Sequence, residues 1–140
     1  MKKRIRSIII ILTICLLCPC FLLSCSGGID TDEAKEHINE FLSAIAQEDY
    51  EKAEKLLHPD RPADIEEFIK NYEEQTGLDL SSGITVKRNT GFRYSYYSST
   101  VDGSTYELTM SAEVGGTNIT ITVEIVQNDN GYGVYNFSIN

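Results

Sequence analysis

All four cysteines of this 140-residue chain lie in one segment near its start, CLLCPCFLLSC at positions 15–25. Clustered cysteines can coordinate zinc, and a CxxC pair can also exchange disulfides. A zinc site needs a second ligand pair, but Cys15 and Cys18 have neither a histidine nor another CxxC pair within the segment. A redox pair needs a surrounding βαβ pattern, which is also missing. The spacing therefore favours neither metal binding nor redox catalysis, and we expect no metal ion or cofactor.

The residues around the cysteines are typical of a secretory signal peptide, with four basic residues among positions 2–6 and an apolar stretch over 8–23. The motif LLSC at 22–25 resembles the lipobox of bacterial lipoproteins, in which a small residue precedes the modified cysteine. Only Cys25 follows such a residue. The resemblance implies a diacylglycerol thioether on Cys25 and removal of residues 1–24. The alternative is an uncleaved membrane anchor, because the apolar stretch approaches the ~18 residues that can span a bilayer.

The chain that remains after the predicted cleavage is strongly acidic. The leader contains four of the 12 basic residues and none of the 21 acidic ones, so residues 25–140 carry a formal charge of −13. A surface of this charge repels nucleic acid and anionic lipid headgroups. We therefore expect no nucleic-acid partner.

The two histidines lie outside every catalytic or metal-binding motif that we recognise. The sequence contains no HExxH, GxSxG, glycine-rich phosphate loop or EF-hand spacing. We expect His37 on the polar side of a helix and His58 at a helix end, both at the surface. No catalytic residue is predicted.

An aromatic run, FRYSYY at 92–97, is the best candidate for a binding surface. Side chains alternate along a strand, so Phe92, Tyr94 and Tyr96 would share one face. We hypothesise that Tyr94, Tyr96 and Tyr106 line a cavity between a sheet and its helices, where they contact a ligand or partner. The alternative is ordinary packing of aromatic side chains between neighbouring strands.

Three helices are predicted in the first half of the domain. Asp30 and Asp49 are placed to cap the first two, and the prolines in HPDRP at 58–62 end the second. The third covers roughly 63–76, with Gly77 as its C-cap. The apolar residues at helical spacing, which we expect to face the core, are Ala34, Ile38, Phe41, Leu42, Ile45 and Ala46, then Tyr50, Ala53, Leu56 and Leu57, then Ile65, Phe68, Ile69 and Tyr72.

Four antiparallel strands follow, separated by the turn motifs VDGS, GGTN and NDNG. The first, about 84–99, is long enough that Gly91 should mark a bulge or bend. In the last, over 132–139, the apolar residues change parity, so its buried face is ambiguous. Apolar and polar residues alternate cleanly in the two central strands. The buried face of the second strand should contain Tyr106, Leu108, Met110, Ala112 and Val114, and that of the third should contain Ile119, Ile121, Val123 and Ile125.

The order of elements predicts an α+β domain in which N-terminal helices pack on one curved four-stranded antiparallel sheet. We divide the chain into a signal peptide (1–24), a lipidated tether (25–30) and a single α+β domain (31–140). The stretch INEFLSAIAQEDYEKAEKLLHPD at 38–60 resembles the opening of the nuclear transport factor 2-like, cystatin-like superfamily. That resemblance implies a cone-shaped sheet, and it extends over nearly the whole domain.

These observations predict a lipid-anchored, extracytoplasmic domain that binds a small molecule or a protein without catalysis. The superfamily also contains isomerase-like enzymes, so the resemblance leaves open an isomerase or dehydratase with a buried carboxylate base of raised pKa. A third alternative is a structural or immunity-type module that presents the polar face of its sheet to a protein partner. A cavity of a few hundred Å³ would distinguish binding or catalysis inside the domain from recognition at its surface.

Overall fold

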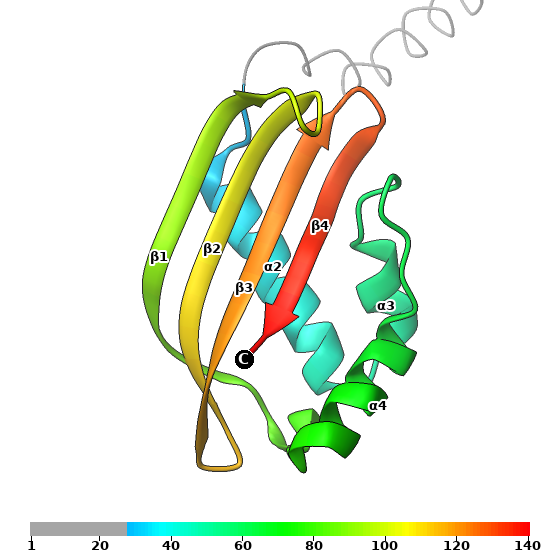
Figure 1. The fold of residues 1–140 in the computed structure, drawn as a ribbon, viewed down its shortest axis with the longest axis vertical. Coiled ribbons are helices and arrows are strands. Elements are labelled where there is room, and N and C mark those ends of the chain that lie inside the picture. Colours follow the sequence, from blue (N-terminus) through cyan, green and yellow to red (C-terminus); the bar gives the residue numbers. More distant parts are fainter. Residues whose placement is uncertain (1–27) are drawn as a thin grey trace, which may run out of the picture.

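The computed structural model describes residues 28–140, in which three α-helices and a short 3₁₀ helix precede a four-stranded sheet (Figure 1). The predicted signal peptide and Cys25 lie outside the described residues. Within the described part of the chain, no helix is both long and apolar enough to cross a membrane. The packed body begins at Ile29, whose side chain is buried two residues before the predicted start of the domain.

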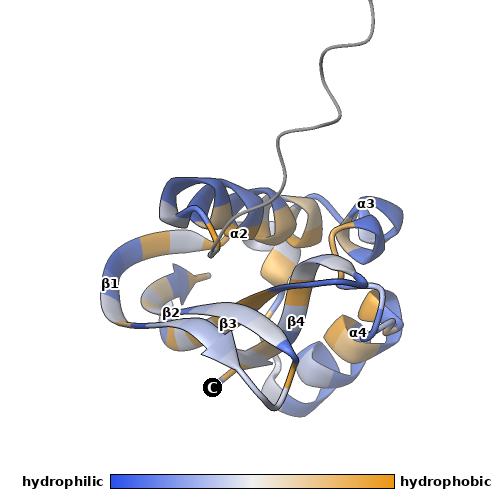
Figure 2. Ribbon diagram, turned by 90° about the horizontal axis from the view of Figure 1, so that it is seen from above, coloured by the Kyte–Doolittle hydropathy of each residue, from blue (hydrophilic) through white to orange (hydrophobic). Residues whose placement is uncertain are grey.

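Helix α2 (Thr31–Ala46) lies across the inner face of the sheet (Figures 1 and 2). The Asp30 side chain accepts hydrogen bonds from the backbone N–H groups of Asp32 and Glu33, which confirms the predicted N-cap. The predicted apolar stripe is buried except at its end, where Ala44 is buried and Ala46 is only half-buried.

Helices α3 (Tyr50–Lys55) and α4 (Ile65–Thr76) lie beside strand β4, at one edge of the sheet (Figure 1). Asp49 caps α3, and Gly77 ends α4 in the left-handed conformation at φ 71°, as predicted. The prediction for Phe68 is wrong, because its side chain is 39% exposed rather than part of the core. A 3₁₀ helix, η1 (Leu80–Ser82), leads to the sheet.

The sheet is an antiparallel meander in the order β1 (Thr85–Ser98), β2 (Gly103–Val114), β3 (Thr117–Asn128) and β4 (Gly131–Ile139). The register of β1 shifts beside Gly91, which confirms the predicted bulge, and β1 curls toward the start of α2 (Figure 2). A further bulge lies in β4, where Val134 pairs with Ile125 but Asn136 pairs with Glu124. Tyr135 is the extra residue, and this insertion explains the change of parity in the last strand.

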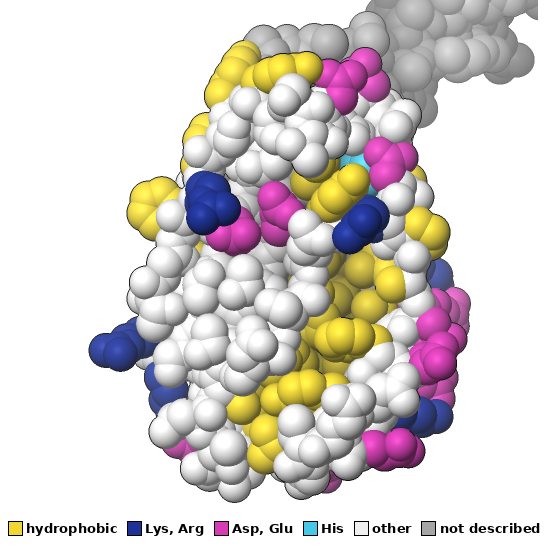
Figure 3. Space-filling model, in the orientation of Figure 1, with side chains coloured by type: hydrophobic (Ala, Val, Ile, Leu, Met, Phe, Trp, Pro, Cys, Tyr) yellow, Lys and Arg dark blue, Asp and Glu magenta, His cyan; other side chains and the backbone are white. Residues whose placement is uncertain are grey.

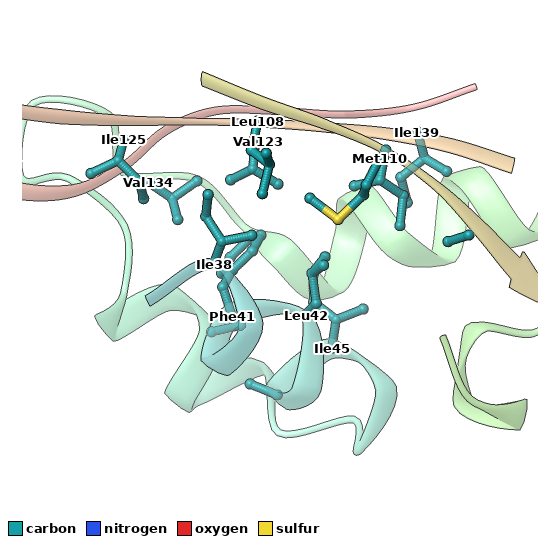
Figure 4. Packing of buried hydrophobic residues seen from close by; sticks show 14 of the residues in the cluster. Ile38, Phe41, Leu42, Ile45, Leu108, Met110, Val123, Ile125, Val134 and Ile139 are labelled. Carbon is teal, nitrogen blue, oxygen red and sulfur yellow. The ribbon is translucent and has the colours of Figure 1, made fainter. Parts of the chain in front are cut away.

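One hydrophobic core fills the space between α2 and the sheet (Figure 4). Ile38, Phe41 and Ile45 of α2 are fully buried against apolar side chains of the central strands. The predicted buried faces of β2 and β3 are confirmed. Helices therefore cover one face of an open antiparallel sheet, the expected α+β arrangement, and the space between them is packed.

Candidate functional site

The three candidate tyrosines occupy different environments. Tyr106 is 2% exposed and belongs to the core, whereas the side chain of its direct cross-strand partner, Tyr94, is 40% exposed. Tyr96 is more exposed still and lies farther along the sheet edge. The structure therefore brings Tyr94 and Tyr106 together but separates Tyr96 from the core, and contact of the three with a ligand stays a prediction.

Tyr106 also lines an open groove of about 490 Å³ between the start of α2 and the bend of β1. Thr31 and Lys35 contribute from α2, and Asn89, Thr90, Gly91 and Phe92 contribute from β1. The hollow beside Tyr106 is therefore an open groove at the surface, whereas the prediction was a cavity between the sheet and the helices.

The prediction that His58 lies at the surface is wrong, because its side chain is fully buried. Its Nδ1 accepts a hydrogen bond from the backbone N–H of Asp60 at 3.1 Å, so the ring proton is on Nε2. Nε2 in turn donates to Oδ1 of Asn128 at 3.1 Å. The ring of Tyr135 contacts the His58 ring edge to face. The histidine is therefore a fully satisfied link between the loop after α3 and the end of β3.

Asn128 is the centre of this polar cluster. Its Oδ1 also accepts the backbone N–H groups of Asn130 and Gly131, and its Nδ2 donates to a carboxylate oxygen of Asp60. Hydrogen bonds from Asn130 and then Asn128 hold the pKa of Asp60 below its ordinary value. The cluster thus joins the β3–β4 turn to the loop that contains His58.

Backbone hydrogen bonds attach the same loop to β4. The N–H of His58 donates to the carbonyl of Val134 at 2.8 Å, and the N–H of Val134 donates to the carbonyl of Leu56 at 2.9 Å. His37 is half-buried rather than exposed, and its Nε2 atom lies 2.8 Å from the same carbonyl oxygen of Leu56. A Cβ atom added at Gly133 would lie 2.7 Å from the backbone nitrogen of His58, so this close approach requires glycine.

An apolar groove runs along the outer edge of β4, between this strand and α4 (Figure 3). Its upper part has a volume of about 390 Å³ and its lower part about 290 Å³, and both parts include Phe68 and Phe137. The two rings lie 5.5 Å apart between centroids. The other apolar lining residues are Leu57, Pro62, Ala63, Ile65, Tyr72, Val134, Tyr135 and Ile139.

The groove is apolar at its floor and polar at its ends. At the upper end, the guanidinium of Arg61 lies 5.0 Å from the Tyr135 ring centroid and donates to the side-chain oxygen of Asn136. At the lower end, Asn71 and Gln75 of α4 line the wall. Glu67 and Glu74 are exposed neighbours of Asn71 on the helix surface, so the α4 rim is acidic.

Backbone groups of β4 also face this groove. β4 is an edge of the sheet, and Asn140 exchanges two hydrogen bonds with Thr120 of the chain segment beside it. In an antiparallel pair the bonded positions alternate, so the N–H and C=O groups of Phe137 and Ile139 point away from β3. They bond to no other group among residues 28–140. The edge is thus covered at Val134 and open beyond it.

Sequence reasoning did not identify Phe68 and Phe137 as site residues. Phe68 follows the helical period of the core stripe, and Phe137 lies where the parity of the last strand is ambiguous. The one sequence feature that indicated this site is the order of the strands, because the last strand of a four-strand meander lies at an edge of the sheet. It could not show that α4 leaves this edge open.

The described residues contain neither a metal-binding cluster nor a buried carboxylate. Residues 28–140 contain no group of three His, Cys, Asp or Glu side chains that could hold a metal ion. No Asp or Glu is buried in the same region, and the carboxyl groups with altered pKa values, Asp30, Glu40, Glu51, Asp60 and Asp79, all have lowered ones. The base required by the isomerase alternative is therefore missing from the part of the chain that the structure describes.

One buried hydroxyl has no partner in the described structure. The Oη atom of Tyr132 is buried without a hydrogen bond, although the His37 ring packs against the tyrosine ring edge to face. Burial, with smaller contributions from the carboxylates of Glu33 and Asp30, raises the pKa of Tyr132 to about 12. This hydroxyl therefore stays neutral throughout the physiological pH range.

No protein-family model, no curated protein and no solved structure matches this chain. Its function is therefore inferred from its own sequence motifs and from the geometry of residues 28–140.

Proposed function

We propose that this chain is a non-catalytic, lipid-anchored extracytoplasmic domain that binds an extended segment of a partner protein along β4. The observation that carries the proposal is the open edge of β4 at Phe137 and Ile139, which faces an apolar groove. An extended peptide can supply backbone donors and acceptors to such an edge while its alternate side chains enter pockets.

The chemistry of the groove selects the kind of segment. Apolar side chains fit against Phe68 and Phe137, which form its floor. The acidic rim of α4 and the net charge of −13 on residues 25–140 favour lysine or arginine at the positions that point outward. We therefore expect a segment in which apolar and basic residues alternate.

The polar outer face of the sheet is a weaker candidate for the partner site. Its groups already bond to one another: Lys87 pairs with Glu113 at 3.2 Å, and the hydroxyls of Thr109 and Thr122 lie 3.2 Å apart. A partner would have to compete with these contacts, whereas the backbone groups at the β4 edge have no competing partner among residues 28–140.

The location rests on the sequence motif at Cys25, which lies outside the described residues. The proposed diacylglycerol would hold the domain on the outer side of a membrane through a short tether. Metabolic labelling with a fatty-acid analogue tests this part, and the label should appear in the parent protein and disappear in Cys25→Ala. Label that survives the substitution would overturn the anchor.

We further propose kinship with the nuclear transport factor 2-like, cystatin-like superfamily. The order of helices before a curved meander supports this, as does the break at Glu48, which has a positive φ of 55° just before α3. The kinship adds no function, since this fold hosts unrelated activities.

The binding proposal is tested with a displayed library of random ten-residue peptides, selected on the parent protein. Selected peptides should lose binding at least about tenfold in Phe68→Ser, because a ring buried on binding contributes 1.4 kcal/mol or more. The matched control is Phe92→Ser, which removes an exposed aromatic ring from the opposite edge of the sheet and should leave binding unchanged.

Backbone methylation of a selected peptide distinguishes strand addition from simple hydrophobic contact. Every second backbone N–H group of the peptide would be methylated. Binding should be abolished when the methylated groups are those that face β4, and it should be unchanged when they are those that face away from β4. Equal effects of the two methylation patterns, or a peptide whose binding depends on Phe92 rather than Phe68, would overturn the proposal. Failure to select any peptide would overturn it as well.

A further inference from the structure

The chain enters the domain across two tyrosines of β1. A Cβ atom added at Gly28 would lie 2.1 Å from the Tyr94 hydroxyl and 3.3 Å from the Tyr96 ring, so the Gly28 backbone rests directly on both side chains. Gly28 has a φ of 89°, which favours glycine. The entry point of the tether is therefore fixed beside the end of β1 (Figure 1).

The predicted lipid lies close to this point. Cys25 precedes Gly28 by three residues, which span at most about 10 Å when fully extended. A diacylglycerol on Cys25 therefore brings the headgroup region of a bilayer within reach of Tyr94 and Tyr96, whatever path the tether takes.

The side chains at this place suit a membrane interface. Four aromatic residues within positions 92–97 form what we call the aromatic end of β1, namely Phe92, Tyr94, Tyr96 and Tyr97, which are 75%, 40%, 64% and 61% exposed. Large apolar side chains are rarely left in water together. Tyrosine combines an apolar ring with a polar hydroxyl and is enriched where hydrocarbon meets water.

The charge of β1 also differs from that of the rest of the domain. Thr85–Ser98 contains Lys87, Arg88 and Arg93 and no acidic residue, although residues 25–140 together carry −13. Arg93 is 77% exposed and lies 3.8 Å from Glu107, a long contact that leaves most of the guanidinium free for a phosphate. Lys87 pairs with Glu113 on β2, so Arg88 and Arg93 are the cations of this strand that can contact lipid phosphates, and they weaken locally the repulsion of anionic lipid expected from the net charge.

We infer that the aromatic end of β1 binds the lipid surface next to the anchor and orients the domain, with β1 toward the membrane and the β4 groove away from it. This inference rests on the proposed lipidation of Cys25. Phe92 and Tyr96 insert between headgroups, and Arg88 and Arg93 contact lipid phosphates. The opposite edge of the sheet then faces the partner protein.

The test uses the lipidated protein in vesicles of phosphatidylcholine and phosphatidylglycerol at a ratio of about four to one. Modification of Cys25 leaves no free thiol after residue 24, so one engineered cysteine carries a fluorophore. Ser99→Cys places it beside the aromatic end of β1, and Thr117→Cys places it at the far end of the sheet. Lipids with a nitroxide quencher should quench the first probe and leave the second bright.

Substitution of the aromatic residues separates this inference from the effect of the tether alone. Phe92→Ser with Tyr96→Ser should reduce quenching at position 99 at least about threefold, whereas Phe68→Ser should not reduce it. All of these side chains are exposed, and circular dichroism verifies that each variant is folded. Unchanged quenching in the double variant would overturn the membrane contact while leaving the anchor intact. Absence of the fatty-acid label from the parent protein would instead overturn the proposed anchor.

Discussion

The Nε2 atom of His58 lies 3.1 Å from Oδ1 of Asn128, a residue 70 positions later in the chain. This hydrogen bond joins the loop after α3 to the turn between β3 and β4. The two residues thereby fix the upper end of the β4 groove, because Asp60 and Arg61 of the same loop line it. Together with the backbone hydrogen bonds of Leu56 and His58 to Val134, this contact holds the loop against the edge of the sheet.

Removal of the Asn128 side chain should be costly. Asn128→Ala leaves the Nε2 proton of a fully buried His58 and two turn N–H groups without acceptors, so we expect a loss of about 2–3 kcal/mol in the free energy of unfolding. Urea denaturation measures the change. Asn118→Ala, at an exposed position of β3, is the control and should change it by less than about 0.5 kcal/mol. Equal effects would show that the cluster does not hold the loop.

The carboxylate of Asp60 should make stability depend on acid pH. Hydrogen bonds from Asn130 and Asn128 lower its folded-state pKa below the ordinary value of 3.8. The unfolded chain therefore binds a proton first as the pH falls, and the stabilisation present above pH 3.8 is lost as the pH falls through the folded-state pKa. Between pH 5 and pH 2, the free energy of unfolding should therefore decrease less in Asp60→Asn than in the parent. Identical pH profiles would contradict this assignment.

Two edge-strand glycines should differ sharply in their tolerance of a methyl group. A Cβ at Gly133 would lie 2.7 Å from backbone atoms of both Leu57 and His58, and this segment cannot move without breaking the hydrogen bonds of Leu56 and His58 to Val134. Gly133→Ala should therefore lower the free energy of unfolding by about 2 kcal/mol or more. A Cβ at Gly91 meets only the Thr109 side chain at 3.8 Å, so Gly91→Ala should change it little. Thermal or urea unfolding of the two variants provides the comparison, and equal losses would refute it.

The buried hydroxyl of Tyr132 gives a prediction at alkaline pH. Since its folded-state pKa is about 12 and the ordinary value is 10.0, the unfolded chain ionises first, and stability should fall as the pH rises between these values. Absorbance titration should show one tyrosine ionising after the others, and Tyr132→Phe should remove that step. Because the hydroxyl lacks a partner, the same variant should be at least as stable as the parent at pH 7. A clear loss of stability would indicate a bound partner for this hydroxyl.

Local signals in the sequence determined the elements of the fold. Asp30 and Asp49 cap helices because their carboxylates reach free backbone N–H groups within three residues, and Gly77 ends a helix because it tolerates a positive φ. The alternation in β2 and β3 identified their buried faces, since one face of a covered sheet is dry. The predicted lipidation of Cys25 also depends on local sequence alone.

Only the tertiary structure decided which surfaces are open. His58 is buried because a turn 70 residues away supplies its acceptor, and no spacing in the sequence relates the two. Phe68 has the period of a core residue, but α4 stands away from β4, so its ring lines a groove instead. The bulge at Tyr135 set the buried parity of β4, and the path of Gly28 placed the tether on Tyr94 and Tyr96. Periodicity reports which side of an element is apolar, whereas exposure depends on what packs against that side.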